Sequence, residues 1–384
     1  MSNQGIKVVH VITGLSLGGA EIMLYKLLSA MDRRAFANRV VSLTGEGEMA
    51  APIRELEIPV KALGMSPGLP SPAGLWRLRQ ALRRDRPAVV QTWLYHADLM
   101  GLVAAGLAGV PKVAWNVRCS DMGESYYRGL NGLVVRALAV LSSRPQVVVS
   151  NSQAGRTMHE GLGYHPRRWD IIPNGFDLEA FRPDRQRRAA VRGALGLAEE
   201  SPLIGMVARY DPVKGQDIFL AAAAVLAAQR PEVHFALIGP GCDGNNAELA
   251  ELARPVPRQR LHTLGLRRDI AAVTAALDIA SCASHGEGFP NAVGEAMACA
   301  VPCAVTNVGD CAVMVGETGR VVPAGDPAAL AAALLELVDL GPEGRQRLGQ
   351  SARQRLKEHY SLDRIAGRYE ALYRELADQP TASR

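Results

Sequence analysis

The sequence Ser284-His285-Gly286-Glu287-Gly288-Phe289-Pro290-Asn291-Ala292-Val293-Gly294-Glu295-Ala296-Met297 is the stretch from which the fold of this chain can be inferred. The apolar run at 278–283 before it is typical of a short buried strand, and the residues at 291–299 have the pattern of a helix. Two glycines allow a turn between them. Pro290 suits the first helical position, because its φ is already fixed and it has no N–H to satisfy. The stretch is therefore predicted to be a strand, a turn and a helix.

Its two glutamates fall in different parts of that unit, Glu287 in the loop and Glu295 within the helix. A carboxylate accepts two hydrogen bonds and binds vicinal hydroxyls well, so one glutamate could hold a ribose and the other a hexose. The backbone N–H groups of Phe289 and Asn291 would lie at a helix N-terminus, where hydroxyl or anionic oxygens are favoured. Two solvated glutamates on an ordinary strand, turn and helix would give the same pattern, so this segment alone leaves both interpretations open.

In its context the stretch resembles the donor-site motif of family-four retaining glycosyltransferases of the GT-B fold. The resemblance rests on Glu-x7-Glu, on Gly-Phe-Pro-Asn at 288–291, and on Glu-Ala-Met-Ala-Cys at 295–299. It implies that Glu287 faces the transferred sugar and that Glu295 binds the nucleotide ribose. It also implies an α/β fold in which two Rossmann-like domains with parallel sheets face an interdomain cleft.

The composition fits a globular enzyme of two domains. A chain of 384 residues is too long for one ordinary core, and 48% of it is apolar. Aromatic residues are only 5% of the chain, which argues against a stacking surface for nucleic acid. The net charge of +5 is too small for the dense basic patch of a DNA-binding protein, but it suits an anionic substrate or an anionic lipid. We therefore expect no nucleic-acid partner.

The sequence favours a cytoplasmic protein. It enters a strand at once without a charged-then-apolar signal, and no apolar run reaches membrane-spanning length. Six scattered cysteines without metal-ligand spacing favour small buried hydrophobes in a reducing cytosol. A basic amphipathic helix at 75–84, with Trp76 near its start, could touch the inner face of an anionic membrane. A solvated outer helix is the alternative interpretation of that segment.

The alternation of strands and helices runs through both halves of the chain, which predicts two parallel sheets with right-handed crossovers. We expect an N-terminal, acceptor-side domain over residues 1–180 and a C-terminal, nucleotide-sugar-binding domain over residues 188–360. The resemblance further implies that a last helix at 361–378 packs back on the first domain.

Glycines and cations at the ends of two strands suggest phosphate contacts. Gly18 and Gly19 lie between a strand and a helix, where backbone N–H groups can approach a diphosphate, and they match the family's Gly-Gly-Ala-Glu loop. Arg209 and Lys214 follow the strand at 202–208, where two cations can neutralise a leaving diphosphate. Surface solvation is the usual explanation for such a pair. Here the spacing and the Lys-Gly sequence resemble the family's phosphate-clamping pair, which favours function.

Two further strand ends carry polar residues on the expected acceptor side. Ligands bind at the C-terminal ends of strands in open parallel sheets, and many relatives have a histidine at the end of the strand that corresponds to 88–93. Trp93 takes that place here, and His96 follows three residues later, as a site residue or as a capping or core histidine. Asn116 and Arg118 end the next strand. Arg118 would suit a phosphate, although a structural salt bridge would explain it equally well.

Together these features predict a hexosyltransferase that uses a nucleotide sugar, most simply a UDP-sugar, as donor and needs no cofactor. Retention of configuration is implied by the resemblance, and a metal is expected to be unneeded because two cations would do its work. The expected acceptor is a glycan or a polyprenyl-diphosphate-linked sugar in cell-envelope or exopolysaccharide biosynthesis. A nucleotide-sugar epimerase with the same fold is the alternative. The candidate catalytic residues are Glu287, Lys214, Arg209 and His96; the candidate donor-binding residues are Gly18, Gly19, Arg209, Lys214, Gly288, Phe289, Pro290, Asn291 and Glu295; and the candidate acceptor residues are Asn116 and Arg118.

Overall fold

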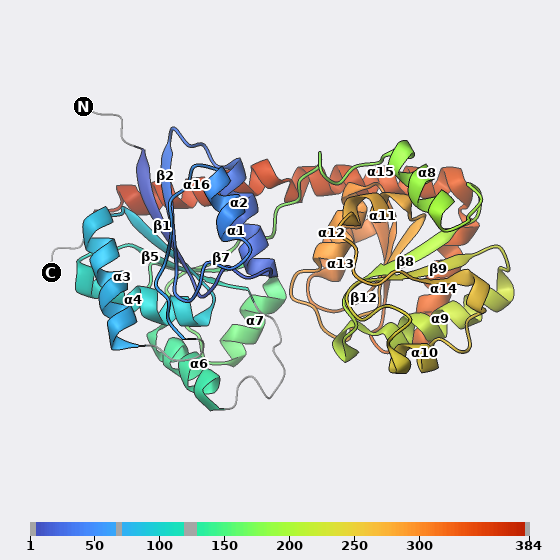
Figure 1. Cartoon of the computed structure of the whole chain (residues 1–384), viewed down its shortest axis with the longest axis horizontal. Coiled ribbons are helices and arrows are strands. Elements are labelled where there is room, and N and C mark those ends of the chain that lie inside the picture. The colour runs from blue at the N-terminus through green and yellow to red at the C-terminus, as the bar shows by residue number, and fades with distance from the viewer. Residues whose placement is uncertain (1–4, 67–70, 119–128, 381–384) are drawn as a thin grey trace. The chain divides into compact units, whose positions relative to one another are not determined.

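The computed structural model describes residues 5–66, 71–118 and 129–380, which form two compact units (Figure 1). The first unit contains the chain up to Gly175 and again from Leu362, and the second unit contains Phe176–Ser361. The first segment of the first unit thus ends at Gly175, five residues before the predicted boundary at residue 180, and Phe176 belongs to the second unit. Its N–H donates to the carbonyl of Tyr360 (2.9 Å), and its ring stacks on Phe289 with centroids 6.2 Å apart.

The first unit is built on a seven-stranded sheet in the order β3-β2-β1-β4-β5-β6-β7, and every pairing in it is parallel. Its strands are β1 (Ile6–Ile12), β2 (Phe36–Ser42), β3 (Val60–Ala62), β4 (Val89–Trp93), β5 (Val113–Val117), β6 (Val147–Ser150) and β7 (Trp169–Ile171). Its helices are α1 (Gly19–Ala30), α2 (Ala50–Glu55), α3 (Pro72–Asp85), α4 (Tyr95–Ala108), α6 (Gly129–Leu141), α7 (Gln153–Gly161) and α16 (Leu362–Asp378).

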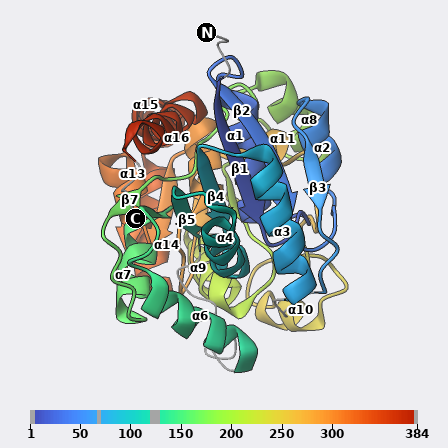
Figure 2. The same ribbon diagram turned by 90° about the vertical axis from the view of Figure 1, so that its left-hand side faces the viewer.

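Helices cover both faces of this sheet, which explains why its central strands read as continuous apolar runs. On one face, α1, α2 and α16 form a core with residues such as Val8 and Ile12; on the other, α3, α4 and α6 pack with Val9 and Val11. The alternation of these residues along β1 follows the two-residue period of a strand. The helices α3 and α4 can be followed side by side in Figure 2.

The C-terminal helix α16 belongs to the first unit because of one apolar stripe. Ile365, Tyr369, Leu372, Tyr373 and Leu376 recur at helical spacing and are all buried against α1, β1 and β4. Each such side chain contributes about 1.5–3 kcal/mol when it is fully buried. The apolar stripe of α16 therefore holds this helix on the first unit.

The second unit has a six-stranded parallel sheet in the order β10-β9-β8-β11-β12-β13. Its strands are β8 (Leu203–Val207), β9 (His234–Ile238), β10 (Leu261–Thr263), β11 (Ile279–Cys282), β12 (Cys303–Thr306) and β13 (Gly319–Val322). Its helices are α8 (Arg185–Ala194), α9 (Gln216–Gln229), α10 (Ala247–Leu252), α11 (Ile270–Ala276), α12 (Asn291–Ala298), α13 (Cys311–Val315), α14 (Pro327–Asp339) and α15 (Gly341–Tyr360).

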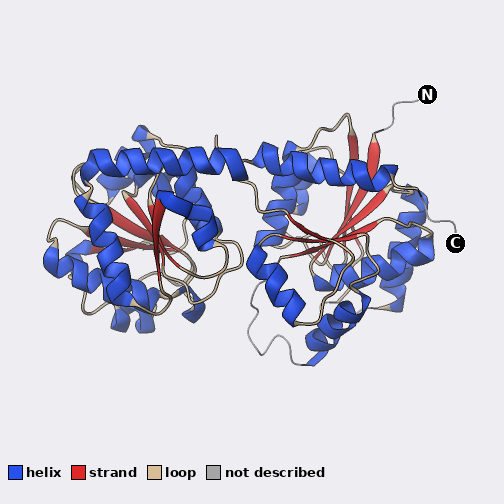
Figure 3. Cartoon of the chain, turned by 180° about the vertical axis from the view of Figure 1, so that it is seen from behind, coloured by secondary structure: helices blue, strands red, loops and turns tan. Residues whose placement is uncertain are grey.

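This second sheet is also covered on both faces, by α9 and α14 on one side and by α11, α12, α13 and α15 on the other. Figure 3 shows the strands of each unit enclosed between layers of helices. The predicted α/β class with two Rossmann-like parallel sheets is thereby confirmed. In the part of the chain that the structure describes, no helix is both long enough and apolar enough to cross a membrane.

Several helices begin where the sequence offers an N-cap side chain. The side-chain oxygens of Ser71, Ser152, Asp184, Asn246 and Asp326 each accept from a backbone N–H three residues on, at 2.9–3.1 Å. Such a cap satisfies one of the N–H groups that a helix start leaves without a partner, and its loss costs about 0.5–2 kcal/mol. These caps fix the starts of α3, α7, α8, α10 and α14.

Candidate active site

Lys214 and Glu287, which are far apart in the sequence, are in direct contact in the second unit. Lys214 ends a 3-10 turn (Pro212–Lys214) that follows β8, and Glu287 lies in the loop after β11. The strands β8 and β11 are neighbours in a parallel sheet, so their C-terminal ends meet at one edge. There Lys214 Nζ donates to Glu287 Oε1 at 2.6 Å. Their side chains are 20% and 12% exposed, so the pair is sheltered yet reachable from solvent.

The loop that carries Glu287 is anchored to the sheet by a chain of hydroxyls. Ser284 Oγ donates to Glu287 Oε1 (2.7 Å), the same oxygen that accepts from Lys214. The carbonyl of Ser284 in turn accepts from Thr306 Oγ1 at the end of β12 (2.7 Å). Glu287 is therefore oriented by two donors on one oxygen. Sequence reasoning missed Ser284 and Thr306, although Ser284 begins the stretch that carries the motif.

Gly215 explains how Lys214 reaches this position. Its φ is +72°, a left-handed conformation that glycine adopts at little cost. A Cβ built on Gly215 would lie 2.1 Å from the carbonyl oxygen of Ala283, which is backbone and cannot move aside. Position 215 therefore requires glycine, because any other residue would keep the chain from passing so close to β11. This explains the Lys-Gly sequence.

We expect Gly215→Ala to lower kcat/KM at least about tenfold, because strain at this turn displaces Lys214 and an error near 1 Å in a catalytic group can cost 10²-fold. Gly196→Ala is the matched control. Gly196 has a φ of +67°, but a Cβ there would meet nothing within 4 Å. The control should lose about 1 kcal/mol of stability and no activity. Steady-state kinetics and thermal unfolding of both variants measure this, and equal activity in the two would refute the role of Gly215.

Arg209 lies at the same end of β8, paired with a carboxylate of its own. Its Nη2 and Nε both donate to Asp211 Oδ2, at 2.7 and 3.1 Å. Burial raises the pKa of Asp211, but the Val213 N–H and the Arg209 guanidinium outweigh that effect and hold the pKa below its ordinary value. The Arg209 side chain is 61% exposed. It can therefore turn toward a ligand with little cost from lost packing.

The helix that follows the loop carries Glu295 on its half-buried side. It begins at Asn291, one residue later than the sequence pattern predicts, because the carbonyl of Pro290 accepts the N–H groups of Val293 and Gly294 and Pro290 serves as the N-cap. Phe289, beside the half-exposed Gly288, is buried against Phe176. This packing fixes the direction in which the helix leaves the loop.

Gly18 and Gly19 of the first unit lie at the start of α1, with Gly18 beside the carboxylate of Glu21. Gly18 is the N-cap of α1 and Gly19 its first residue. A Cβ on Gly19 would meet nothing within 4 Å, whereas one on Gly18 would lie 2.4 Å from a carboxylate oxygen of Glu21. Glu21 thus folds back over the helix start, and burial raises its pKa. From the sequence, Glu21 is predicted only to be part of the Gly-Gly-Ala-Glu loop.

Arg118, at the end of β5, is held in place from several sides. It donates to the side-chain oxygens of Asn174 and Asn116 (3.5 Å for the latter), and its guanidinium lies 5.2 Å from the centre of the Trp93 ring. Asn116 itself has no exposed surface and donates to Tyr369 (2.8 Å). The structure therefore places Asn116 as a support for Arg118, because its amide is used within the core. Asp121, which follows this strand in the sequence and is a further candidate for the acceptor side, lies outside the described residues.

His96 lies half-buried in the first turn of α4, after the left-handed residue Leu94. Trp93, which takes the place of the family's histidine, is completely buried and donates to His10 Nδ1 (3.3 Å). Trp93 thus belongs to the core under Arg118.

The chemistry of the second unit's site follows from its charges. Two cations, Lys214 and Arg209, and two carboxylates, Glu287 and Glu295, come from the C-terminal ends of β8 and β11 and the elements that follow them. The cations suit phosphate oxygens, and the carboxylates suit sugar hydroxyls. Among residues 5–66, 71–118 and 129–380, no three His, Cys, Asp or Glu side chains are grouped to hold a metal ion.

Each half of the chain matches a protein-family model. Residues 17–180 match "Glycosyltransferase Family 4", and residues 201–339 match "Glycosyl transferases group 1". The first match covers the first unit from α1 to β7, and the second covers the part of the second unit that holds Lys214, Glu287 and Glu295.

Among known proteins, the chain is 29% identical over 334 residues to the putative glycosyltransferase EpsF of Bacillus subtilis, with 80% of each chain covered. It is 29% identical over 235 residues to UDP-Gal:alpha-D-GlcNAc-diphosphoundecaprenol alpha-1,3-galactosyltransferase of Escherichia coli, and that similarity spans 60% of each protein. Among solved structures, Anabaena Alr3699/HepE in complex with UDP superposes with a TM-score of 0.82 at 22% identity, covering 96% of this chain and all of the other.

Proposed function

This chain is a glycosyltransferase with the GT-B fold, and on that basis we propose that it transfers a hexose from a UDP-sugar with retention of configuration. The observation that supports this proposal most is the contact between Lys214 and Glu287. Without a ligand the two charges neutralise each other. A bound donor can replace both partners at once, with its diphosphate on Lys214 and its sugar hydroxyls on Glu287.

The remaining donor contacts follow from the same edge of the sheet. Arg209 is exposed enough to leave Asp211 for a phosphate, and Glu295 on α12 is assigned to the ribose. Gly288, Phe289, Pro290 and Asn291 form the loop and helix start between the two glutamates. The UDP and UDP-glucose complexes of Anabaena Alr3699/HepE support a uridine donor.

Catalysis by these residues rests on the charge of the leaving group. As the bond between sugar and diphosphate breaks, negative charge grows on the diphosphate, and Lys214 and Arg209 are assigned to stabilise it. No metal is required in this scheme. The departing phosphate accepts the proton of the attacking acceptor hydroxyl on the same face of the sugar, so configuration is retained without a covalent enzyme intermediate.

The acceptor is assigned to the first unit through Arg118, which three neighbours hold in place and which suits a phosphate. The E. coli relative is named for an acceptor linked to diphosphoundecaprenol. A glycan or polyprenyl-diphosphate-linked acceptor of cell-envelope or exopolysaccharide biosynthesis fits both observations. In this scheme Asn116 positions Arg118, and His96 stays a candidate site residue.

A transfer assay tests the proposal. The full chain is incubated with UDP-, GDP- and ADP-sugars and a polyprenyl-diphosphate-linked acceptor, with and without EDTA, and the anomeric configuration of the product is read by NMR. We expect transfer from a UDP-sugar, unaffected by EDTA, with the configuration of the donor. An inverted product would refute retention. A new sugar epimer formed without acceptor would instead indicate an epimerase.

A membrane-bound acceptor would bring the chain to a lipid surface. Two helices of the first unit present exposed side chains that suit contact with such a surface. On α3, Trp76 is 55% exposed beside the exposed Arg77, Arg83 and Arg84. On α6, Leu133 and Val140 are 59% and 73% exposed at helical spacing. Exposed apolar side chains flanked by arginines suit the boundary between headgroups and acyl chains. We therefore propose a peripheral contact with anionic membrane through these helices.

We expect the chain to bind vesicles of phosphatidylglycerol and phosphatidylcholine, and Arg77→Glu/Arg83→Glu to weaken that binding at least about tenfold, since each basic residue near the surface contributes about 1 kcal/mol. Cosedimentation at low and high salt measures the effect. Arg254→Glu/Arg258→Glu changes the net charge equally in the second unit and should keep more of the binding. Equal losses in the two double variants would show attraction by net charge alone.

A further inference from the structure

A cavity of about 540 Å³ lies at the opposite edge of the second sheet from Lys214 and Glu287. It is lined by residues that precede strands, such as Asp278 before β11 and Pro302 before β12. In a parallel sheet all strands begin at one edge and end at the other. A ligand in this cavity would therefore be separate from a donor held at the strand ends.

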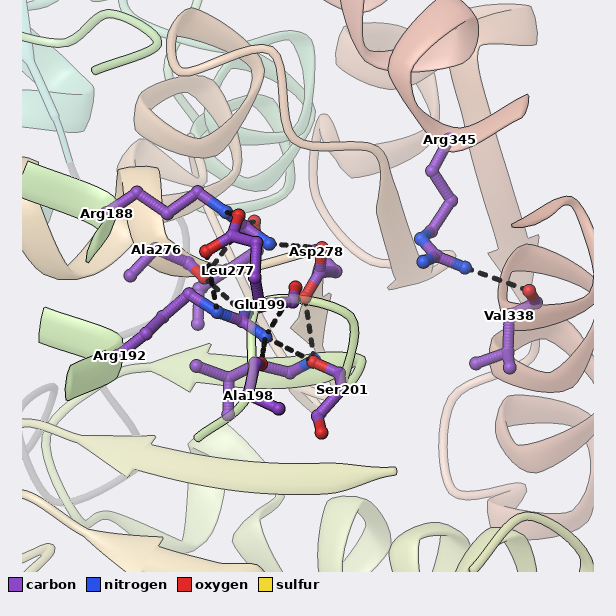
Figure 4. Close-up of polar contacts among 11 residues, drawn as sticks. Arg188, Arg192, Ala198, Glu199, Ser201, Ala276, Leu277, Asp278, Val338 and Arg345 are labelled. Atoms are coloured by element: carbon purple, nitrogen blue, oxygen red, sulfur yellow. Dashed lines mark hydrogen bonds and ion pairs between the residues drawn. The ribbon is translucent and has the colours of Figure 1, made fainter. Parts of the chain in front are cut away.

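The carboxylates around the cavity are already satisfied by arginines. Asp278 accepts from Arg188 Nη2 (2.9 Å), Arg192 Nη1 (3.0 Å) and the N–H of Leu203 (2.8 Å). Glu199 accepts from Arg188 Nε at 2.9 Å. Figure 4 shows Arg188 and Arg192 converging on these two carboxylates and on nearby carbonyl groups. Asp184, the third carboxylate of the lining, caps α8 and lies 3.3 Å from Arg187.

Arg345 is different, because it is buried without a carboxylate. It is 5% exposed and lines the cavity from α15. Its Nη1 donates to the carbonyl of Val338 (2.9 Å), and no carboxylate of the described residues lies within ion-pair distance of it. In Figure 4 it stands apart from the Arg188 and Arg192 group, and its dashed contact leads only to Val338. Burying a charged group is costly unless it is paired.

Three arginines, Arg185, Arg188 and Arg345, line the cavity together with three carboxylates. Arg188 is paired with Asp278 and Glu199, whereas Arg185 and Arg345 have no carboxylate within ion-pair distance among the described residues. Burial lowers the pKa of Arg345; Asp278 opposes that shift, and Arg188 and Arg192 add to it. The N-terminus of α15 also borders the cavity, at Pro342–Gln346, and such an end favours negative charge, whereas that of α8 is already capped by Asp184.

We propose that this cavity binds the phosphate group of a small phosphorylated metabolite, with Arg345 and Arg185 as its ligands. A phosphate would supply the missing partner of Arg345. The cavity is within the usual 300–1,000 Å³ of ligand pockets and so has room for more than the phosphate, and the exposed amides of Gln346 and Gln350 line the remaining space. Such a ligand would touch the start of β11 and the end of α12 at Cys299, the two elements that lead to Glu287 and carry Glu295.

Binding of inorganic phosphate and of glucose 6-phosphate to the full chain tests this, by calorimetry at constant ionic strength. Four proteins are compared: the wild type, Arg345→Gln, Arg185→Gln and the donor-site control Lys214→Met. We expect saturable binding to the wild type and to Lys214→Met, and at least about tenfold weaker binding to Arg345→Gln, since a charged hydrogen bond contributes about 1.5–3 kcal/mol. Arg185, an exposed residue, provides a variant that folds if Arg345→Gln does not.

Three results would overturn the proposal: no saturable binding to the wild type, unchanged binding to both arginine variants, or a loss confined to Lys214→Met. The two probes distinguish the sources of the phosphate group. Tighter binding of glucose 6-phosphate identifies a phosphorylated metabolite, and equal binding identifies free phosphate at the same arginines.

Discussion

Replacing Lys214 by methionine is expected to lower kcat by a factor of about 10²–10³, the usual cost of removing one group that stabilises developing negative charge. Methionine keeps the length and the apolar stem of the side chain, so the loss reports the charge. Lys357→Met removes an exposed lysine from α15 in the same unit and should leave turnover unchanged. Lys214→Arg restores the charge and should recover part of the rate.

A double variant separates this role from a structural one. If Lys214 served only to neutralise Glu287, then Lys214→Met/Glu287→Gln would be as active as Glu287→Gln alone, because no carboxylate would be left unpaired at 12% exposure. We expect the double variant to be slower than Glu287→Gln and no faster than Lys214→Met. Recovery of turnover in the double variant would contradict the assignment of Lys214 to the donor diphosphate.

Arg192→Met is expected to lower the free energy of unfolding of the second unit by about 3–5 kcal/mol, as removal of one partner from a buried ion pair does. Arg192 is 1% exposed and donates to Asp278 and to the carbonyls of Ala198, Glu199, Ser201 and Ala276. A methionine would leave these acceptors buried with fewer donors. This network ties α8 to the start of β11.

The tryptophans allow this effect to be assigned to a unit. All four of them, Trp76, Trp93, Trp115 and Trp169, belong to the first unit. Urea unfolding followed by tryptophan fluorescence therefore reports the first unit, whereas far-UV circular dichroism reports both. Arg187→Met, which removes an exposed ion pair of α8, is the control and should cost less than about 1 kcal/mol. A similarly small cost for Arg192→Met would contradict the importance of the network.

The elements with strong apolar patterns could be predicted from the sequence, and helix α15 shows where the pattern failed. The strand, loop and helix around the two glutamates were expected within a residue or two, because β11 is mostly apolar and α12 follows two glycines. The buried side of α15 instead contains Gly344, Arg345, Gly349 and Ala352. Small and charged residues give no apolar period, so this helix, the longest of the described residues, was not predicted as an element of its own.

Contacts between distant residues were beyond the sequence for a different reason. Lys214 and Glu287 were each predicted to bind the donor, but their pairing depends on β8 lying next to β11, which no local pattern encodes. The same holds for Asn116, which the sequence placed on the acceptor side and whose amide binds Tyr369, 253 positions along the chain. The cavity around Arg345 likewise gathers residues from α8, α11 and α15.

The structure of the full chain with bound UDP tests the central claim most directly. The account predicts that a diphosphate oxygen accepts from Lys214 Nζ, that the ribose hydroxyls donate to Glu295, and that the Lys214 contact with Glu287 is broken or shared. UDP bound away from these residues, with the Lys214–Glu287 pair unchanged, would contradict it.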